Sequence, residues 1–340
     1  MKILVSGSKG FIAGYFIEEL LSNGYEVIGI DNLSKYGQVE KSYDACPKYT
    51  FVKGDVKNTP LMKKLLHDCD HFLAGAAMIG GISYFHEFAY DLLAENERIT
   101  ASSFDAAIHS YRTGKLKKIS VISSSMVFEN TNIYPTPEGN QFECPPPQST
   151  YGFQKLATEY FAKGAYEQYK LPYTIIRPFN CIGIGEKRAL CDTEIKSGNV
   201  TLAMSHVVPD LVQKILKGQN PIHILGEGNQ IRHYTYGGDL AKGIYATLEN
   251  KNSVNEDFNI STSVSTSVIE LAKIIWEKIK GKNTPFSYVS DKPFLYDVQK
   301  RVPNISKAKQ ILGFEATTGL KSALDEIVPW IQNQVELGKI

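Results

Sequence analysis

A phenol and an ammonium group stand four residues apart in Tyr151-Gly152-Phe153-Gln154-Lys155. At the start of a helix, both side chains project from one face. A free phenol has a pKa near 10 and is a poor base at neutral pH. A nearby positive charge favours the phenolate, and lowering the pKa by roughly 3 units corresponds to about 4 kcal/mol. Tyr151 is therefore a candidate general base that takes a proton from a hydroxyl group.

A serine cluster ends an apolar run upstream, in Ile122-Ser123-Ser124-Ser125. A hydroxyl group there can bind a substrate oxygen through a hydrogen bond and share its proton with Tyr151. Both features also have purely structural explanations, because Tyr-x-x-x-Lys pairs are common on surface helices and small polar residues often end strands. Their chemical interpretation therefore depends on a fold that brings them together beside a cofactor.

A glycine-bearing turn supplies a candidate cofactor site. Gly7-x-x-Gly10-x-x-Ala13 follows the first apolar run and opens the first amphipathic segment. Gly7 permits a tight turn, Gly10 lets the backbone approach a pyrophosphate, and the small Ala13 allows close packing. Asp31 ends the second apolar run 24 residues after Gly7, where a carboxylate binds the adenosine ribose and repels a 2′-phosphate. We therefore expect NAD rather than NADP, with hydride leaving the carbon whose hydroxyl Tyr151 deprotonates.

Short apolar runs and amphipathic segments alternate over the first 180 residues. Nearly continuous apolar strands separated by helices predict an α/β fold with a doubly wound, Rossmann-type parallel sheet covered on both faces. Such a sheet binds its ligand at the carboxyl ends of its strands, which is where Gly7, Asp31 and Ser124 stand. The predicted strands are 3–6, 26–30, 50–53, 71–74, 118–123 and 173–176. The predicted helices are 11–22, 60–67, 92–111 and 154–169.

A smaller C-terminal lobe is predicted from the change of pattern after Phe179. Residues 181–206 are polar and glycine-bearing, with no strong period. The predicted elements after them are the helices 208–217, 268–280 and 320–336 and the strand 222–225. We expect an NAD-binding domain made of 1–178 plus about 229–258, and a substrate-binding lobe made of about 179–228 plus 259–340.

The composition argues against several other classes of protein. The 340 residues contain 37 Lys plus Arg against 36 Asp plus Glu, so no excess charge indicates a nucleic-acid or membrane partner. No apolar stretch approaches the roughly 18 residues of a membrane span, and the first residues lack a signal-peptide pattern. The scattered cysteines form no metal-ligand cluster, so we expect free thiols, no metal and a cytoplasmic protein. They are Cys46, Cys69, Cys144, Cys181 and Cys191.

Together these features resemble the extended short-chain dehydrogenase/reductases of the nucleotide-sugar epimerase and dehydratase group, over nearly the whole chain. The resemblance implies NAD as cofactor, a nucleotide-diphosphate sugar as substrate, and a homodimer formed through 92–111 and 154–169. Tyr151 and Ser124 would be catalytic, with Ser125 as the alternative serine, and Lys155 would bind the nicotinamide ribose and lower the tyrosine pKa. The implied cofactor-binding residues are Gly7, Gly10, Phe11, Ile12, Asp31, Asn32, Asp55, Val56, Leu73, Ala74 and Lys155. The implied substrate-binding residues are Met78, Ser124, Met126, Asn180, His206, Val207, Arg232 and Arg301.

Several segments carry this assignment. Asp55-Val56 resembles the family's adenine-contacting pair, and 73–77 resembles the strand end beside the cofactor. Residues 176–180 resemble an R-P-x-N stretch in which Asn180 faces the sugar diphosphate. Arg232 and Arg301 resemble two arginines that bind this diphosphate, which suits the strength of charge-assisted, bidentate hydrogen bonds.

Departures from the family narrow the chemistry. Ser125-Met126 stand where the 4,6-dehydratases carry an Asp-Glu pair, and the glutamate that the sugar-acid decarboxylases carry near this point is also absent. Residues 79–82 resemble a stretch of the 3,5-epimerases, which however have a cysteine where Met126 stands. His206 replaces a substrate-binding asparagine. His233 is either a surface histidine or a substrate contact.

These departures favour redox chemistry at a single sugar carbon, C4. We expect an epimerase that oxidises the C4 carbinol, lets the 4-keto sugar rotate and returns hydride to its other face. A net C4 dehydrogenase or 4-keto reductase is the nearest alternative. A 4,6-dehydratase or 3,5-epimerase fits less well, and an NAD-sensing regulator without catalytic activity fits least.

Overall fold

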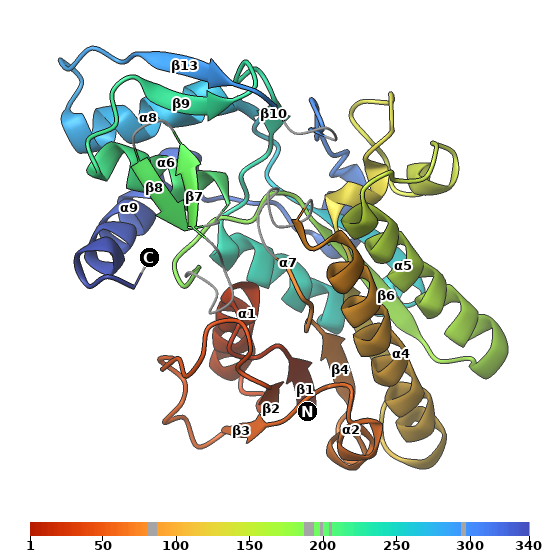
Figure 1. The fold of residues 1–340 in the computed structure, drawn as a ribbon. Helices are drawn as coiled ribbons and strands as arrows, with labels where there is room; N and C mark the ends of the chain where they lie inside the picture. The colour runs from red at the N-terminus through yellow and green to blue at the C-terminus, as the bar shows by residue number, and fades with distance from the viewer. Residues whose placement is uncertain (80–86, 187–193, 198–199, 204–205, 294–296, 340) are drawn as a thin grey trace.

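A parallel β-sheet flanked by helices forms the larger part of the molecule, and a smaller lobe stands over one end of it (Figure 1). The structure is a computed structural model that describes residues 1–79, 87–186, 194–197, 200–203, 206–293 and 297–339. The sheet and its helices confirm the predicted α/β, Rossmann-type fold with a smaller C-terminal lobe.

Seven strands of the described residues form this sheet in the order β11-β6-β5-β4-β1-β2-β3, and all neighbouring pairs run parallel. The chain winds outward from β1 in both directions, so a crevice opens at the carboxyl ends of β1 and β4. The strands are β1 (Lys2–Ser6), β2 (Glu26–Asp31), β3 (Tyr49–Lys53), β4 (His71–Ala74), β5 (Lys118–Ile122), β6 (Tyr173–Pro178) and β11 (Glu256–Ile260).

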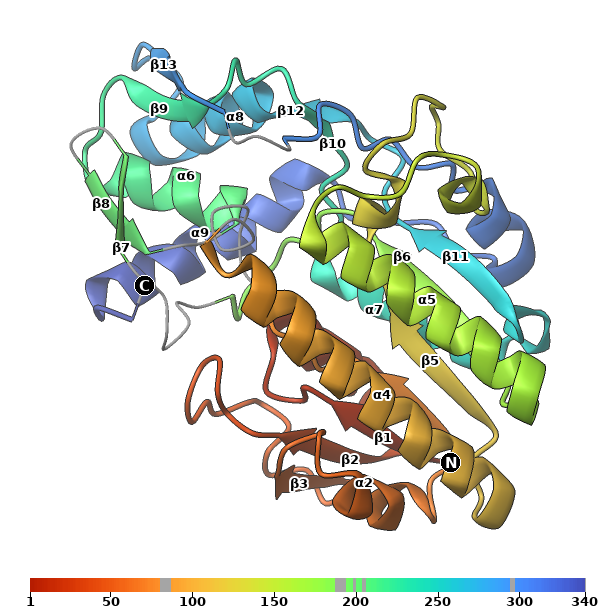
Figure 2. The same ribbon diagram turned by 45° about the vertical axis from the view of Figure 1, so that its right-hand side comes forward.

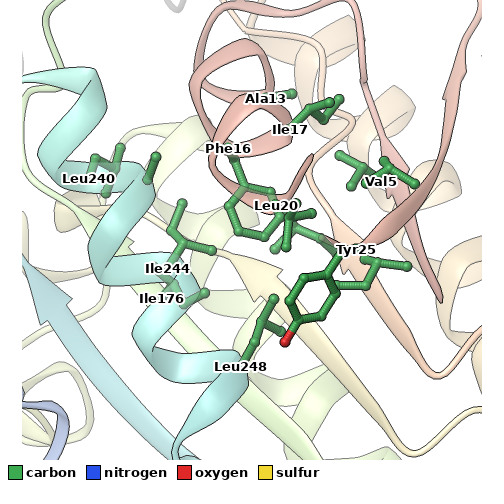
Figure 3. Close-up of a cluster of buried hydrophobic side chains, with 14 of the residues drawn as sticks. Val5, Ala13, Phe16, Ile17, Leu20, Tyr25, Ile176, Leu240, Ile244 and Leu248 are labelled. Atoms are coloured by element: carbon green, nitrogen blue, oxygen red, sulfur yellow. The ribbon is translucent and has the colours of Figure 1, made fainter. Parts of the chain in front are cut away.

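Helices cover both faces of the sheet (Figure 2). On one face α1 (Phe11–Ser22) packs against α7 (Gly237–Glu249), and on the other lie α2 (Thr59–Leu66), α4 (Ala89–Thr113) and α5 (Thr150–Tyr169). Figure 3 shows Phe16 and Leu20 of α1 directed towards Ile244 of α7. These apolar residues recur every three to four positions, which gives each helix one buried stripe.

The smaller lobe is built around an apolar cluster shared by three helices, which are α6 (Val207–Leu216), α8 (Val268–Lys280) and α9 (Leu320–Glu336). Its strands pair as β9 (Ile222–Leu225) with β13 (Tyr288–Asp291), β10 (Ile231–Arg232) with β12 (Thr266–Ser267), and β7 (Glu194–Ser197) with β8 (Val200–Ala203). Short helical turns complete the described fold at η1 (Ser125–Phe128), η2 (Asn140–Phe142), η3 (Lys251–Ser253) and η4 (Ala308–Leu312).

The structure differs from the sequence-based expectation in two places that matter for function. The helix predicted at 154–169 begins at Thr150, so Tyr151 and Lys155 both lie on α5. The segment 181–206, in which we found no strong period, contains the hairpin of β7 and β8. Each strand of this hairpin has four residues, too few for alternation of polar and apolar residues to be recognised. The proposed domain boundaries stay a prediction.

Two expectations concern the chain as a whole. None of the helices formed by the described residues is both long enough and apolar enough to cross a membrane. Cys46, Cys69, Cys144 and Cys181 carry free thiols, and Cys191 lies outside the described residues.

Candidate active site

A cavity of about 1110 Å³ lies between the carboxyl end of the sheet and the smaller lobe. It brings together nearly all the site residues predicted from the sequence. Those that line it are Gly7, Gly10, Phe11, Ile12, Asp31, Asn32, Asp55, Val56, Leu73, Met78, Ser124, Met126, Tyr151, Lys155, Asn180, His206, Val207, Arg232 and Arg301. Ala74 is the exception, because side chains alternate along a strand and Ala74 packs against the core on the other face of the sheet.

The start of α5 is held in place by a carboxylate that directly follows η1. Ser149 is the N-cap residue, and its hydroxyl accepts a hydrogen bond from the amide of Gly152 at 3.0 Å. Glu129 in turn accepts hydrogen bonds from the backbone amides of Gln148 and Ser149, both at 3.1 Å. These contacts fix the first helical turn, which carries Tyr151 into the cavity.

Tyr151, Ser124 and Lys155 meet at this point. Ser124 stands two residues after the end of β5 and hydrogen-bonds the phenol of Tyr151, while its Oγ also accepts a hydrogen bond from the amide of Met126 at 3.2 Å. The Lys155 Nζ donates to the carbonyl of Ile122 at 3.0 Å and lies 5.9 Å from the centroid of the Tyr151 ring. The serine that faces the phenol is therefore Ser124, the first of the two alternatives.

Burial sets the protonation of this group. It raises the pKa of Tyr151, whereas the hydrogen bond from Ser124 and the positive charge of Arg301 act in the opposite direction. Burial also lowers the pKa of Lys155 to about 8. Arg301 is thus the cation that acts on the phenol here, and the role expected of Lys155 in lowering the tyrosine pKa stays a prediction for the protein with bound cofactor.

The glycine turn after β1 fits a dinucleotide. Gly7 has a φ of +72°, and a Cβ atom there would stand 3.0 Å from the Cα of Ala76. A Cβ atom on Gly10 would stand 2.9 Å from the carbonyl oxygen of Gly7. Only glycines therefore leave the backbone open to a pyrophosphate at the start of α1.

The acid at the end of β2 also lies where a ribose-binding carboxylate is expected. Asp31 lines the cavity and accepts hydrogen bonds from the amides of Lys9 at 3.0 Å and Leu33 at 2.7 Å. Beside it, the Asn32 amide donates to Asp55 at 3.3 Å. These contacts fix the carboxylates of Asp31 and Asp55 at one end of the cavity.

Two arginines define a second, positively charged part of the cavity. Arg232 makes an ion pair with Asp297 at 3.3 Å. Burial, together with the charge of Arg232, lowers the pKa of Arg301 to about 9. Arg301 Nε and Asn180 Nδ2 are buried without a hydrogen-bond partner among the described residues. Unsatisfied buried donors are costly, so these groups fit a site that takes an anionic ligand.

His206 stands where the family has an asparagine, and its side chain pairs with a carboxylate. It stands as the residue before α6 and pairs with the carboxylate of Glu186, which also lines the cavity. Burial acts to raise the pKa of Glu186, but His206 and the charge of Lys35 hold it below its ordinary value. Glu186 is therefore an acid in the cavity, next to His206, that was not predicted from the sequence. The contact of His206 with substrate stays a prediction.

His233 corrects one expectation. It is neither a surface residue nor part of the cavity lining, because its side chain is only 2 % exposed and it is not among the residues that line the cavity. Its Nδ1 lies 2.8 Å from the carbonyl oxygen of Thr262, and its Nε2 lies 2.8 Å from the hydroxyl of Ser265. His233 therefore fixes the turn that leads into β12.

Several residues of the site were not predicted from the sequence. Glu186, Cys181, Ser149 and Tyr234 line the cavity. No spacing in the sequence singles out Tyr234, which stands two residues after Arg232. Of the stretch 79–82 that resembles the 3,5-epimerases, 80–82 lie outside the described residues. Met126 packs against Leu92 and Tyr151.

Comparisons with known proteins agree with this geometry. Residues 3–261 match the model of the NAD dependent epimerase/dehydratase family. A putative UDP-glucose 4-epimerase of Methanocaldococcus jannaschii is 30% identical over 332 residues, covering 97% of this chain and 98% of that protein. The crystal structure of UDP-glucuronic acid 4-epimerase from Bacillus cereus in complex with UDP-glucuronic acid and NAD has a TM-score of 0.81 at 26% identity, covering 98% of this chain and 99% of that one. A human dTDP-D-glucose 4,6-dehydratase is 24% identical over 345 residues, covering 97% of this chain and 89% of that protein.

Proposed function

Because this chain belongs to the NAD dependent epimerase/dehydratase family, we propose that it is a nucleotide-sugar 4-epimerase that acts by transient oxidation at C4 of the sugar. The cofactor of the family is NAD, which when bound would supply the acceptor and later the donor of the C4 hydride. Gly7, Gly10 and Asp31 would hold the cofactor, and Arg232 and Arg301 would hold the diphosphate of the substrate.

Tyr151 and Ser124 would move the proton. For this step Tyr151 would act as the phenolate, the form that Lys155 and the positively charged nicotinamide would favour over the neutral phenol. As hydride leaves C4, the Tyr151 oxygen would take the proton of the C4 hydroxyl, and the Ser124 hydroxyl would hydrogen-bond the C4 oxygen. After the 4-keto sugar has turned over, Tyr151 returns this proton to the oxygen while hydride adds to the opposite face. No other acid is needed for these steps.

The observation that carries this proposal is the apolar character of the residues packed against Tyr151. The two residues that follow Ser124 are Ser125 and Met126, and Met126 is buried in an apolar cluster with Leu92 and Tyr151. A 4,6-dehydratase must protonate a leaving hydroxyl group, and the family's dehydratases do so with acids at these two positions. The apolar surroundings favour chemistry confined to C4.

A net C4 oxidoreductase uses the same residues and is the second candidate. The experiment that separates the two incubates the purified protein with NAD and a panel of UDP-, GDP-, CDP- and dTDP-hexoses, followed by mass spectrometry, NMR and absorbance at 340 nm. We expect a C4 epimer to form without accumulation of NADH. Accumulation of NADH equal to the product would assign a dehydrogenase, and loss of water would assign a dehydratase. No turnover of any sugar, with wild type and Tyr151→Phe alike, would favour a cofactor-sensing protein.

A further inference from the structure

A lysine stands inside the glycine turn that would hold the cofactor. Lys9, between Gly7 and Gly10, lines the cavity although it is only 7 % exposed. Its backbone amide donates to the carboxylate of Asp31 at 3.0 Å, so Lys9 lies directly beside the acid expected to bind the adenosine ribose. Small residues suffice for a turn that approaches a pyrophosphate, and the proposed mechanism makes no use of the cationic side chain of Lys9.

A carboxylate holds the ammonium group of this lysine. The Nζ atom of Lys9 lies 2.6 and 2.7 Å from the two carboxylate oxygens of Asp44, and 4.8 Å from the centroid of the Phe51 ring. Asp44 also accepts a hydrogen bond from the backbone amide of Lys41 at 2.9 Å. An ion pair and a cation–π contact therefore fix the side chain of Lys9, and its positive charge is compensated before any cofactor binds.

The segment that carries Asp44 is anchored to the glycine turn itself. The hydroxyl of Tyr43 donates to the carbonyl oxygen of Ser8 at 2.8 Å, and the Tyr43 ring packs edge-on against Tyr49 of β3, with the ring centroids 4.8 Å apart. The buried ring of Tyr43 thus holds its neighbour Asp44 at Lys9. The side chain of Asp44 is itself 34 % exposed, so its charge can be removed without opening the core.

This arrangement determines which charges a phosphate on the adenosine ribose would meet. NADP differs from NAD by a phosphate on the ribose 2′-oxygen, and such a group carries roughly 1.5 to 2 negative charges at pH 7. Beside Asp31 it would meet a second carboxylate, that of Asp44, and a lysine that is already paired. Lys35, which also lines the cavity, acts on Glu186, where its charge lowers the pKa of the carboxyl group. Like charges brought together cost binding energy, so the two carboxylates disfavour NADP.

We propose that Asp44 is a specificity-determining residue for the cofactor, because by pairing with Lys9 it withholds the cation of the glycine turn from a 2′-phosphate. Asp31 is then one of two residues that select NAD. Removal of the Asp44 charge releases the ammonium group of Lys9, which hydrogen-bonds the 2′-phosphate of NADP. This role concerns the cofactor and does not depend on the sugar that the protein converts.

The test replaces Asp44 by asparagine, which removes the charge and keeps an oxygen for the amide of Lys41. Isothermal titration calorimetry measures the affinity for NAD, and displacement of NAD measures the weaker affinity for NADP. We expect Asp44→Asn to bind NADP about 10-fold more tightly than the wild type, in line with the strength of hydrogen bonds between charged groups, and to bind NAD within about twofold of the wild type. Asp44→Ser removes the same charge with a shorter side chain and should show the same gain, which keeps the test valid if one variant is unstable.

Two further variants assign the gain to Lys9. Lys9→Met combined with Asp44→Asn removes the ammonium group as well and should abolish the gain in NADP affinity. Asp70→Asn is the matched control, because Asp70 also pairs with a lysine, Lys117 at 2.7 Å, and also accepts a backbone amide, that of Lys2 at 2.9 Å. Asp70 directly precedes β4, at the amino ends of the strands and away from the cavity, so Asp70→Asn should leave both affinities unchanged.

The outcomes distinguish a charge effect from a structural one. If neither Asp44→Asn nor Asp44→Ser binds NADP more tightly than the wild type, Asp44 has no part in the choice of cofactor. An equal change in the affinities for NAD and NADP would assign the ion pair to the shape of the turn, and an equal gain in Asp70→Asn would assign the effect to net charge. A gain that persists without the ammonium group would overturn the role of Lys9. All of these results come from cofactor binding, so they stand whether or not the protein proves to be a 4-epimerase.

Discussion

At the scale of single residues, the candidate chemistry depends on one buried phenol that can exchange a proton with a sugar hydroxyl. Phenylalanine keeps the shape of Tyr151 within its apolar cluster with Met126 and Leu92 but has no exchangeable proton. We expect Tyr151→Phe to lower kcat about 10²- to 10⁴-fold, the usual contribution of general acid–base catalysis. The measurement is turnover of the best nucleotide sugar, together with NAD affinity, which should stay within about twofold.

A matched variant on the same helix controls for this prediction. Tyr160 lies on the outer side of α5 and is 58 % exposed. Tyr160→Phe is therefore expected to retain wild-type turnover. Equal turnover by Tyr151→Phe and wild type would contradict the role of Tyr151 as the proton-transfer residue.

The residues that could be predicted from the sequence are those whose types are chemically unusual for their position. Tyr151 with Lys155, the glycine turn and Asp31 stand out because each follows a recognisable strand or opens a helix. Tyr234 and Glu186 could not be recognised in this way, because an isolated tyrosine or glutamate has no distinctive spacing. Their place in the cavity follows from tertiary contacts, such as the pairing of Glu186 with His206.

At the scale of elements, a buried ion pair joins the strands and the helix that carry the site. Glu159 of α5 and Arg177 of β6 are completely buried and bonded at 2.7 Å through both carboxylate oxygens. Glu159 also accepts a hydrogen bond from Ser123, the neighbour of Ser124, at 2.6 Å. Arg177 bonds in addition to Asp257 of β11 at 2.7 Å. The pair therefore ties β5, β6, β11 and α5 together directly behind the catalytic serine.

Removing one member of this pair leaves the other charge buried and uncompensated. We expect Arg177→Met to lower the free energy of unfolding by about 3–5 kcal/mol. The double variant Arg177→Met, Glu159→Leu should recover part of this loss, because it removes both charges. Urea denaturation of the two single variants and the double variant measures the coupling, and strictly additive losses would contradict a direct interaction between the two side chains.

A buried histidine at the start of β4 makes the sheet sensitive to acid. Burial, with a contribution from the charge of Lys118, lowers the pKa of His71 from its ordinary value of 6.5 to about 4. Between these values the unfolded chain binds a proton that the folded chain does not, so stability is complete above pH 6.5 and falls as the pH decreases towards 4. The expected loss from this residue is about 3 kcal/mol over that interval.

The comparison of wild type with His71→Gln isolates this effect, since glutamine does not titrate. Urea denaturation at pH 7 and at pH 4.5 should show a smaller loss of stability in the variant than in the wild type. The same loss in both proteins would assign the acid sensitivity to other groups.

The elements that could be predicted are those in which the apolar residues follow a strong local pattern. The apolar strands β1 and β5 and the helix α1 were identified with at most one residue of difference at an end, because each repeats a strong local signal. The sequence predicts the start of α5 only at Gln154, because Tyr151 and Gly152 do not extend the apolar pattern of the helix. The structure puts it at Thr150, where Ser149 caps the helix locally and Glu129, 20 residues earlier in the sequence, holds Ser149 in place.

At the scale of the whole molecule, substrate and cofactor would be divided between two bodies. The glycine turn, Asp31 and Tyr151 belong to the sheet and its helices, whereas Arg232 stands on β10, which pairs with β12 ahead of α8 in the smaller lobe (Figure 2). Binding of a nucleotide sugar would therefore connect the two parts. The segment 179–186, which follows β6, contributes Asn180, Cys181, Ile182 and Glu186 to the lining of the cavity.

The outer face of the helix pair α4 and α5 bears on the assembly of the molecule. The two helices lie side by side along one flank (Figure 1). On α5, Phe153 and Tyr160 are 49 % and 58 % exposed and stand seven residues apart on one stripe, and a Cβ atom on Gly164 would meet nothing within 4 Å. Aromatic rings next to small residues suit close packing against a second copy of the same helices, and a two-fold axis would bury both stripes at once.

We therefore expect a homodimer formed through α4 and α5, and a monomer when a charge is placed in the stripe. Tyr160→Lys should halve the mass measured by size-exclusion chromatography with light scattering, because two lysines would face each other across the axis without a counter-charge. Val264→Lys alters a residue that is 59 % exposed on the smaller lobe and should leave the mass of the wild type unchanged. If the wild type is monomeric at micromolar concentration, or if Tyr160→Lys keeps the dimer, the interface lies elsewhere. Because the stripe lies on the flank of the sheet domain, away from the cavity, the monomeric variant should still bind NAD.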